Sequence, residues 1–511
     1  MGGPFSPDPT ARLPSGLYRA AQVRGFDRAA IEGFGIPGAT LMARAGEAAF
    51  RALRARWPEA RALAVVCGAG NNGGDGYVVA RLAHEAGLAA RAVAVSDPLR
   101  LRGDAAGAAE AARAAGVPLE PFRPEGLRGA DVLVDALFGT GLDRPLEGEW
   151  AAAVQAVRSV GRPVLALDIP SGLHADTGQV LGAAVRASVT VTFLGLKPGL
   201  FTGAGPACCG RVLFHDLGVP RAVLEGEEPA ALRLDGEALR RVWLAPRRRD
   251  AHKGRFGHVL VIGGDHGYGG AARLAGEAAA RCGAGLVTVA TRPEHVGAMI
   301  AARPELMARG VERASDLAPL LARATVVALG PGLGQGRWGR ELADAALGCG
   351  LPQVVDADAL TFVPQGLAGE PPRVLTPHPG EAARMLGIST AQVQDDRLLA
   401  AASLRERFGA VVVLKGNGTV VDDRQGPPAI CSQGNPGMAT GGMGDLLTGV
   451  VAALLAQGVP PGAAARLGVW LHAEAADAAA RGGERGLLPG DLFGHLTSLV
   501  NPRLPGPPGG P

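Results

Sequence analysis

The sequence is poor in lysine and in asparagine. Only three of its 511 residues are lysine, at positions 197, 253 and 415, although lysine and arginine together number 51. Asparagine occurs five times, and Asn71, Asn72, Asn417 and Asn435 all fall in glycine-rich loops. Because lysine and arginine are not interchangeable at tight sites, the few positions that keep a lysine are favoured as places of specific chemistry.

Other scarcities exclude whole classes of protein. The net charge of +3 gives no electrostatic case for nucleic acid or an anionic membrane as the main partner. No apolar run reaches the length of a membrane span, and the N-terminus lacks the apolar stretch of a signal peptide. The six cysteines lack C-x-x-C spacing, which favours buried thiols in a reducing compartment. We therefore expect a soluble cytoplasmic protein whose partners are small molecules.

The chain is long enough for two hydrophobic cores, and its pattern divides into two α/β halves. Short apolar runs alternate with helical patterns, which predicts parallel sheets covered by helices on both faces. The strands expected in the first half are 62–67, 91–95, 131–137, 163–169 and 188–194, and those in the second are 257–264, 285–291, 325–334, 352–360, 373–381 and 410–421. We predict domains at 1–225 and 251–511, with a linker and domain entry at 226–250.

In the first half, polar residues follow three of the expected strands. Asn72, Asp135 and Ser171 offer oxygen donors at three strand ends, a set that suits a hard cation of low charge density better than zinc. Asp168 stands at a strand end as a candidate general acid or base. The alternative is that these segments are ordinary turns, with Asp168 as a loop cap.

The motifs GAGNNGGDG, VDALFGTGL, LDIPSG and FLGLKPG closely resemble the NAD(P)H-hydrate epimerase domain, over roughly residues 14–217. The resemblance implies a Rossmann-like domain that interconverts the R and S forms of hydrated NADH and NADPH (NADHX and NADPHX). It implies a potassium ion at Asn72, Asp135 and Ser171, and Asp168 as the acid/base residue. The residues that it implies for binding the hydrate are Asn71, Asn72, Gly73, Gly74, Asp75, Gly139, Thr140, Gly141, Leu142, Asp143, Arg144, Pro145 and Asp168.

The second half has the pattern of a phosphate site. LKGNGTVV places Lys415 at a strand end before glycines, GPGLG follows another strand, and GGMGD leads into an apolar helix. Backbone N–H groups at such a helix start, with its dipole, favour anions. A bare glycine loop such as GPGLG is as often a simple turn. The arrangement resembles the ribokinase-like fold, in which the Asp at the helix start is the base.

More narrowly, HKGRFGHVLVIGG, GPGLG, TPHPGE, LKGNGT and NPGMATGGMGD in this order resemble the ADP/ATP-dependent NAD(P)H-hydrate dehydratase, over about 233–499. The chain thus resembles the bifunctional NAD(P)H-hydrate repair enzymes. The implied dehydratase spends ADP, with ATP as the alternative, and uses Mg²⁺. Asp445 would be the base, and the N–H groups of 441–444 would stabilise the transferring phosphoryl group. The implied hydrate contacts are Ala271, Gly332, His378 and Asp445, and the implied ADP or AMP contacts are Lys415, Gly416, Asn417, Gly418, Thr419 and Gly444.

Some interpretations stay open at this point. From the residues alone, His378 in TPHPGE is better explained as a helix cap, whereas the resemblance makes it a substrate contact. Met443 stands where the family usually has threonine, which removes one hydroxyl from the anion loop. A small-molecule kinase of the ribokinase class, or an N-terminal half that serves only as a binding module, are the rival functions. We also expect a homo-oligomer.

Overall fold

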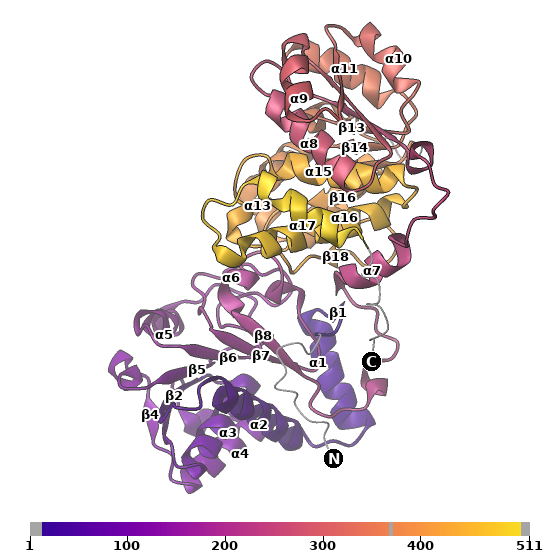
Figure 1. The fold of residues 1–511 in the computed structure, drawn as a ribbon. Helices are drawn as coiled ribbons and strands as arrows, with labels where there is room; N and C mark the ends of the chain where they lie inside the picture. The colour runs from indigo at the N-terminus through magenta and orange to yellow at the C-terminus, as the bar shows by residue number, and fades with distance from the viewer. Residues whose placement is uncertain (1–12, 367–370, 502–511) are drawn as a thin grey trace, which may run out of the picture. The chain divides into compact units, whose positions relative to one another are not determined.

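The computed structural model describes residues 13–366 and 371–501. These residues fall into two compact units that divide between Leu232 and Arg233 (Figure 1). The boundary lies inside the segment expected as a linker, but that segment holds β9 (Ala231–Arg233) and α7 (Gly236–Trp243). Helix α7 forms there because the Asp235 carboxylate caps it, accepting from the N–H of Ala238 at 3.1 Å.

The first unit is built on a sheet of parallel strands in the order β4-β3-β2-β5-β6-β7-β8. The strands are β2 (Ala62–Cys67), β3 (Ala89–Ala94), β4 (Leu119–Pro121), β5 (Val132–Ala136), β6 (Val164–Leu167), β7 (Val189–Phe193) and β8 (Arg211–His215). The helices are α1 (Ala20–Arg28), α2 (Gly38–Arg56), α3 (Asn71–Glu85), α4 (Gly103–Ala114), α5 (Gly148–Ser159) and α6 (Gly205–Cys209), and β1 (Gly16–Leu17) pairs with β9.

Helices cover both faces of this sheet, as the continuous apolar strands predict. Alternate residues of β2 point to opposite faces. Val65 packs in one core with Tyr77 of α3 and with residues of α2 and α4, whereas Val66 packs in another core with Val154 of α5. The chain runs from β2 outwards to β3 and β4, then crosses back to β5 on the other side of β2 and continues to β6. The ligand crevice of such a sheet is therefore expected between the ends of β2 and β5.

The sheet of the second unit has the order β18-β17-β16-β15-β14-β13-β10-β11-β12, parallel except for the hairpin strands β17 and β18. The strands are β10 (His258–Ile262), β11 (Leu286–Thr291), β12 (Met307–Gly310), β13 (Val326–Leu329), β14 (Gln353–Val355), β15 (Arg373–Leu375), β16 (Val411–Leu414), β17 (Val420–Asp422) and β18 (Ala429–Ile430). The predicted segment 410–421 is therefore two antiparallel strands, with the loop 415–419 between them.

The helices of the second unit surround this sheet (Figure 1). They are α8 (Gly269–Arg281), α9 (Val296–Ala302), α10 (Ala318–Leu321), α11 (Arg337–Leu347), α12 (Pro379–Leu386), α13 (Thr390–Asp395), α14 (Arg397–Phe408), α15 (Met443–Ala456), α16 (Pro461–Ala479) and α17 (Leu492–Leu499). Helix α15 is apolar on nearly all sides and is the centre of the core, with Leu446 and Val450 fully buried. Its first turn is thus fixed at the carboxyl ends of the parallel strands.

All six cysteines lie in described parts of the chain and are free thiols, five of them buried, which confirms the prediction of buried thiols for those five. Within the described residues, no helix combines the length and the apolar character needed to cross a membrane.

Candidate active sites

In the first unit, Asp168 is held by a buried lysine. It follows the last residue of β6 and has φ +66°, a left-handed conformation that few residues other than glycine adopt without strain. The side chain of Lys197 has no exposed surface, and its Nζ forms an ion pair with Asp168 Oδ1. The same ammonium donates to Thr192 Oγ1 at 2.8 Å and to the carbonyl of Phe193 at 3.2 Å. The carboxylate is fixed in place, while 15% of the Asp168 side chain stays exposed.

Two further carboxyl groups interact electrostatically with Asp168. Burial, aided by the negative charge of Asp168, raises the pKa of Asp27 on α1 to about 6. Burial, with the charges of Asp168 and Asp27, raises the pKa of Asp75 on α3 well above its usual value. Like charges this close cannot all ionise freely, so a cluster of three carboxyl groups and one ammonium can hold and pass protons.

The predicted cation donors Asp135 and Ser171 form one buried hydrogen-bond network. Ser171 Oγ donates to Asp135 Oδ1 at 2.6 Å, and the Ser171 N–H donates to Asp135 Oδ2 at 2.8 Å. The N–H of Phe138 donates to Ser171 Oγ at 2.9 Å, which ties in the loop after β5. Burial outweighs these hydrogen bonds and raises the pKa of Asp135 to about 6. Among the described residues, the buried amide nitrogen of Asn72 has no hydrogen-bond partner.

The surroundings of Gly139 show that Asp168 and Asn72 lie close together. A Cβ atom added to it would lie 3.0 Å from Asp168 Oδ2 and 3.6 Å from the Asn72 side chain. The structure thus brings Asn72, Gly139 and Asp168 together between the ends of β2, β5 and β6. The predicted segment 71–75 is the first turn of α3 rather than a loop, with Gly73 and Gly74 buried. Of the segment 139–145, Gly139 and Thr140 are half-buried and Leu142 is buried, while Gly141, Asp143, Arg144 and Pro145 are exposed.

The second unit has a lysine–aspartate pair of its own. Lys415 follows β16, and its Nζ donates to Oδ1 of Asp356, which follows β14, at 2.6 Å. Thr448 Oγ1 on α15 donates to Asp356 Oδ2 at 2.8 Å. Burial opposes ionisation of Asp356, but Lys415, Thr448 and Thr376 outweigh it and hold its pKa below the usual value. Burial likewise opposes the charge of Lys415, but Asp356, Glu381 and Asp445 raise its pKa above the usual value.

The predicted base and anion loop lie beside this pair. A Cβ atom on Gly444 would lie 3.2 Å from Lys415 Nζ and 3.5 Å from Asp356 Oδ2. Burial, aided by the negative charge of Asp356 and opposed by Lys415, raises the pKa of Asp445 to about 6. Asp358 and Glu381 add smaller effects in the raising direction. The first turn of α15 therefore carries a poised acid and a nearby cation.

His378 caps α12, as the interpretation from the residues alone predicts. Its Nδ1 accepts from the N–H groups of Gly380 at 3.0 Å and Glu381 at 3.3 Å, and Glu381 Oε2 accepts from the His378 N–H at 2.7 Å. Because Nδ1 accepts, the ring proton belongs on Nε2. The His378 side chain is 54% exposed, and its Nε2 lies 3.4 Å from Glu381 Oε1. A substrate contact there stays a prediction.

The other predicted dehydratase residues lie on two loops. Gly332, with φ +59°, sits against Tyr268 and Ala271, since a Cβ atom on it would be 3.1 Å from the Cβ of Ala271. These residues follow β10 and β13, the two strands from which the chain diverges in opposite directions. The loop of residues 415–419 is held by the buried Arg397, whose Nη2 donates to the carbonyls of Leu414 and Lys415 at 3.0 Å each.

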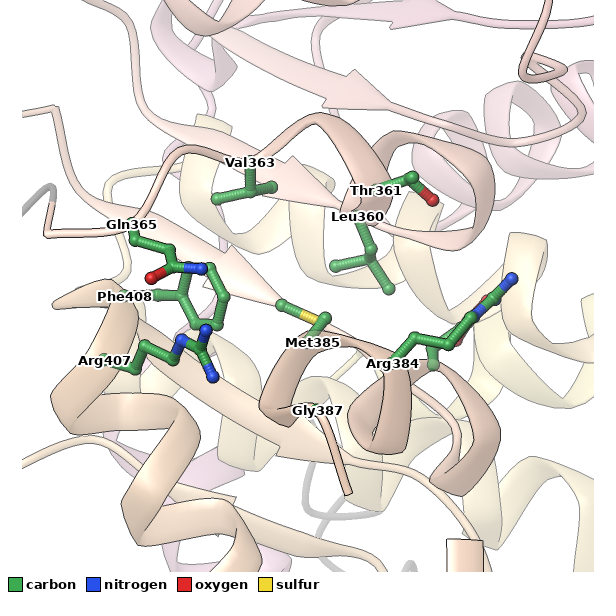
Figure 2. A pocket seen from close by; sticks show the side chains of 10 residues that line it. Leu360, Thr361, Val363, Gln365, Arg384, Met385, Gly387, Arg407 and Phe408 are labelled. Carbon is green, nitrogen blue, oxygen red and sulfur yellow. The ribbon is translucent and has the colours of Figure 1, made fainter. Parts of the chain in front are cut away.

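A cavity of about 230 Å³ lies beside α12 (Figure 2). Figure 2 shows Leu360 and Met385 in its middle, with Arg384 and Arg407 towards opposite ends. It shares Glu381 with the Lys415 cluster but contains none of the predicted site residues. The lining residues are Leu360, Thr361, Val363, Gln365, Glu381, Arg384, Met385, Gly387, Arg407 and Phe408.

Sequence reasoning did not assign several groups that the structure brings into the two sites. Lys197 was inside a quoted motif and is one of only three lysines, a signal that could have singled it out. Glu381 was likewise inside a quoted motif, TPHPGE. Asp27, Asp356 and Thr448 had no comparable signal, because they join the sites only through tertiary packing.

Each of the two α/β units has a lysine–aspartate pair at the carboxyl ends of its parallel strands, with a carboxyl group of raised pKa beside it. This arrangement defines an enzyme with two small-molecule sites. A family model described as YjeF-related protein N-terminus matches residues 38–199, and one described as NAD(P)H-hydrate dehydratase matches residues 259–498.

The chain is 50% identical to the bifunctional NAD(P)H-hydrate repair enzyme of Coxiella burnetii, over 95% of this chain and 99% of that protein. It is 44% identical to the one of Escherichia coli, over 96% of this chain and 95% of that protein. A solved structure of the ADP/ATP-dependent NAD(P)H-hydrate dehydratase of Bacillus subtilis, co-crystallised with ATP and Mg²⁺, is 30% identical, with a TM-score of 0.48, and covers 52% of this chain and 96% of that one.

The chain belongs to the family of bifunctional NAD(P)H-hydrate repair enzymes. The predicted Rossmann-like and ribokinase-like α/β folds and the double activity, NAD(P)H-hydrate epimerase and ADP/ATP-dependent dehydratase, are confirmed. The 50% identity to a bifunctional repair enzyme extends over 95% of the chain. The two rival functions, a small-molecule kinase and an N-terminal binding module, do not explain a similarity that covers both units.

The burial of Met443 generates a prediction about the missing hydroxyl. Its side chain is 4% exposed and packs in the core with α15. We expect Met443→Thr to lose buried contacts, on the order of 1–3 kcal/mol of unfolding free energy. The Michaelis constant for the nucleotide should change by less than about twofold, because the side chain at this position points into the core. Thermal unfolding and dehydration kinetics check both outcomes. A clearly tighter nucleotide constant would show that the hydroxyl reaches the ligand.

Proposed function

We propose that the first unit epimerises NADHX and NADPHX, and that the second dehydrates the S form at the expense of ADP, giving AMP and phosphate. The observation that supports this division most is the contrast between the two ion pairs. The first presents a carboxylate, Asp168, to the crevice, and the second presents an ammonium, Lys415, beside a helix start. A carboxylate suits proton transfer and an ammonium suits phosphate.

Epimerisation needs proton transfer at a ring carbon that carries a hydroxyl next to nitrogen. In our proposal the Asp168 carboxylate receives a proton from Asp27 or Asp75 and passes it to the departing hydroxyl, while the nitrogen lone pair expels that hydroxyl as water. The flat iminium then takes up water on either face, and Asp168 recovers the proton. Lys197 keeps Asp168 in its strained position through the turnover, and Asp27 and Asp75 supply nearby sites for the proton.

The oxygen donors of the first unit fit a potassium ion. Asp135 and Ser171 are buried together, and the buried amide of Asn72 lacks a partner within the described residues, so turning it over would offer its oxygen. These three residues would hold the ion, and K⁺ supplies a fixed positive charge near the departing hydroxyl when bound. Asn71, Asp75 and the residues from Gly139 to Pro145 would bind the hydrate in the crevice.

Dehydration must turn a poor leaving group into a good one. Asp445 takes the proton of the hydrate's hydroxyl, whose oxygen attacks the β-phosphorus of ADP and releases AMP. The ring nitrogen then expels phosphate, and loss of a proton from the neighbouring carbon restores the ring double bond of NAD(P)H. The N–H groups of residues 441–444 and Lys415 stabilise the phosphoryl charge, and His378, Gly332 and Ala271 orient the hydrate.

The nucleotide site is proposed along Lys415, Gly416, Asn417, Gly418 and Thr419, with Gly444 facing the phosphates. ADP is our proposed donor and ATP the alternative. Mg²⁺ neutralises phosphate charge when bound, and Asp358 and Glu381, carboxylates that face Asp445, suit it together with the phosphates themselves. We further propose that the protein is a homo-oligomer and that it is cytoplasmic, the latter in keeping with the free thiols.

The test of the whole proposal uses purified protein with mixed R and S NADPHX, given ADP, ATP or neither. With ADP, absorbance at about 340 nm should return for both epimers, because the first unit keeps converting R to S. Conversion that stops at the S fraction would remove the epimerase activity from the proposal. A stable phosphorylated product would favour a kinase.

Replacing the base separates the two sites. Asp445→Asn should lower the dehydration rate by about 10²–10⁴-fold and leave epimerisation unchanged. In the parent protein, the reaction needs the carboxylate form of Asp445, so kcat/KM should fall as the pH drops through about 6. Epimer ratios measured by chromatography provide the control. A parallel loss of both activities would contradict two separate sites.

Potassium can be tested without turnover. We expect K⁺ to raise the thermal unfolding temperature of the first unit, since it binds only the folded state. Asn72→Ala should abolish this rise and leave the unfolding temperature without K⁺ nearly unchanged, because the Asn72 amide nitrogen has no partner among the described residues. Na⁺ in equal concentration controls for ionic strength. A K⁺ response that persists in the variant would exclude Asn72 as a ligand.

A further inference from the structure

Asp356 is the buried centre of a cluster that joins three elements of the second unit. Its side chain is 1% exposed and accepts from Lys415 Nζ after β16 at 2.6 Å and from Thr448 Oγ1 on α15 at 2.8 Å. Its backbone N–H donates to the carbonyl of Leu329 at the end of β13 at 3.0 Å. The carboxylate is therefore fixed from several sides, and both of its oxygens are in use.

Lys415 depends on this carboxylate for its position. Its next carboxylate, that of Glu381, is 4.0 Å from Nζ. A buried ammonium that loses its partner is strongly disfavoured, so without Asp356 the side chain would turn towards Glu381 or lose its proton. Gly444 has no side chain to block Nζ, which lies 3.2 Å from where its Cβ would be. The ammonium is thereby left open to an anion at the start of α15.

We propose that Asp356 is a positioning residue for dehydration, which holds Lys415 Nζ at the start of α15 where it meets the phosphates of the nucleotide. This inference rests on the proposed nucleotide site and adds a residue that never touches the ligand. Asp356 acts through Lys415, and Thr448 sets the orientation of the carboxylate against α15. The role requires a charge at this exact position, not only a hydrogen-bond acceptor.

A double-mutant cycle tests it. Asp356→Asn should raise the Kd of ADP and lower kcat/KM of dehydration by about tenfold or more, and Lys415→Met should do the same. The double variant should be no worse than Lys415→Met alone, because Asp356 has no role without the lysine. Losses that multiply in the double variant would overturn the proposal, as would an unchanged Asp356→Asn enzyme. ADP binding by calorimetry gives a readout that does not depend on turnover.

Two further variants separate positioning from folding. Asp422→Asn is a matched control, since Asp422 is also buried and pairs with Arg405 at 3.1 Å, but lies at the opposite end of β17 from the loop 415–419. It should lower the unfolding temperature without changing the Kd of ADP. Asp356→Glu keeps the charge and shifts it by one methylene. It should fold, yet bind ADP about tenfold more weakly, and parent-like binding by this variant would count against positioning.

Asp356 lies in the second unit, so the thermal unfolding of that unit in every variant serves as the check on folded protein. If the parent protein shows no ADP-dependent dehydration, the proposed function fails. If the parent is active and the cycle is additive, only the role of Asp356 fails.

Discussion

The ion pair between a buried lysine and an aspartate at a strand end is the interaction on which both sites depend. Parallel strands covered by helices leave little room for charge, so a lysine or aspartate enters the interior only with a partner. Lys197 with Asp168, and Lys415 with Asp356, each meet this condition within one unit. Each pair then fixes the loops that follow its strands, since its members come from different strand ends.

The scarcity of lysine proved to be a physical signal. Two of the three lysines form these pairs, in a chain that otherwise uses arginine for positive charge. A compact ammonium fits a small buried space in which the planar guanidinium would not. The scarcity of asparagine is a less consistent signal of a site. Asn72 lies in the first crevice, whereas Asn435 caps a turn, with its side chain bound to Asp477 at 2.9 Å and to the N–H of Gly437 at 3.0 Å.

Much of the fold could be predicted, because continuous apolar strands and glycine loops are local features. β2 covers the predicted 62–67 without change. The points at which strands end were harder to predict. The predicted strand 352–360 stops at Val355, Asp356 then enters the site, and a 3₁₀ turn begins at Ala357. No local pattern could show that Asp27 of α1 faces Asp168, because that approach is made only by packing across the sheet.

The two pairs differ in which partner they leave accessible, and this difference follows from their surroundings. In the first unit Lys197 is fully enclosed by Thr192 and the Phe193 carbonyl, and the acid keeps 15% of its side chain exposed. In the second the acid is enclosed by Thr448 and α15, and Lys415 keeps 18% exposed. One kind of ion pair thus presents a base in one unit and a cation in the other. Which group can react depends on which member of the pair is buried. The buried member only holds its partner in place, and the partner is the one that meets solvent and substrate.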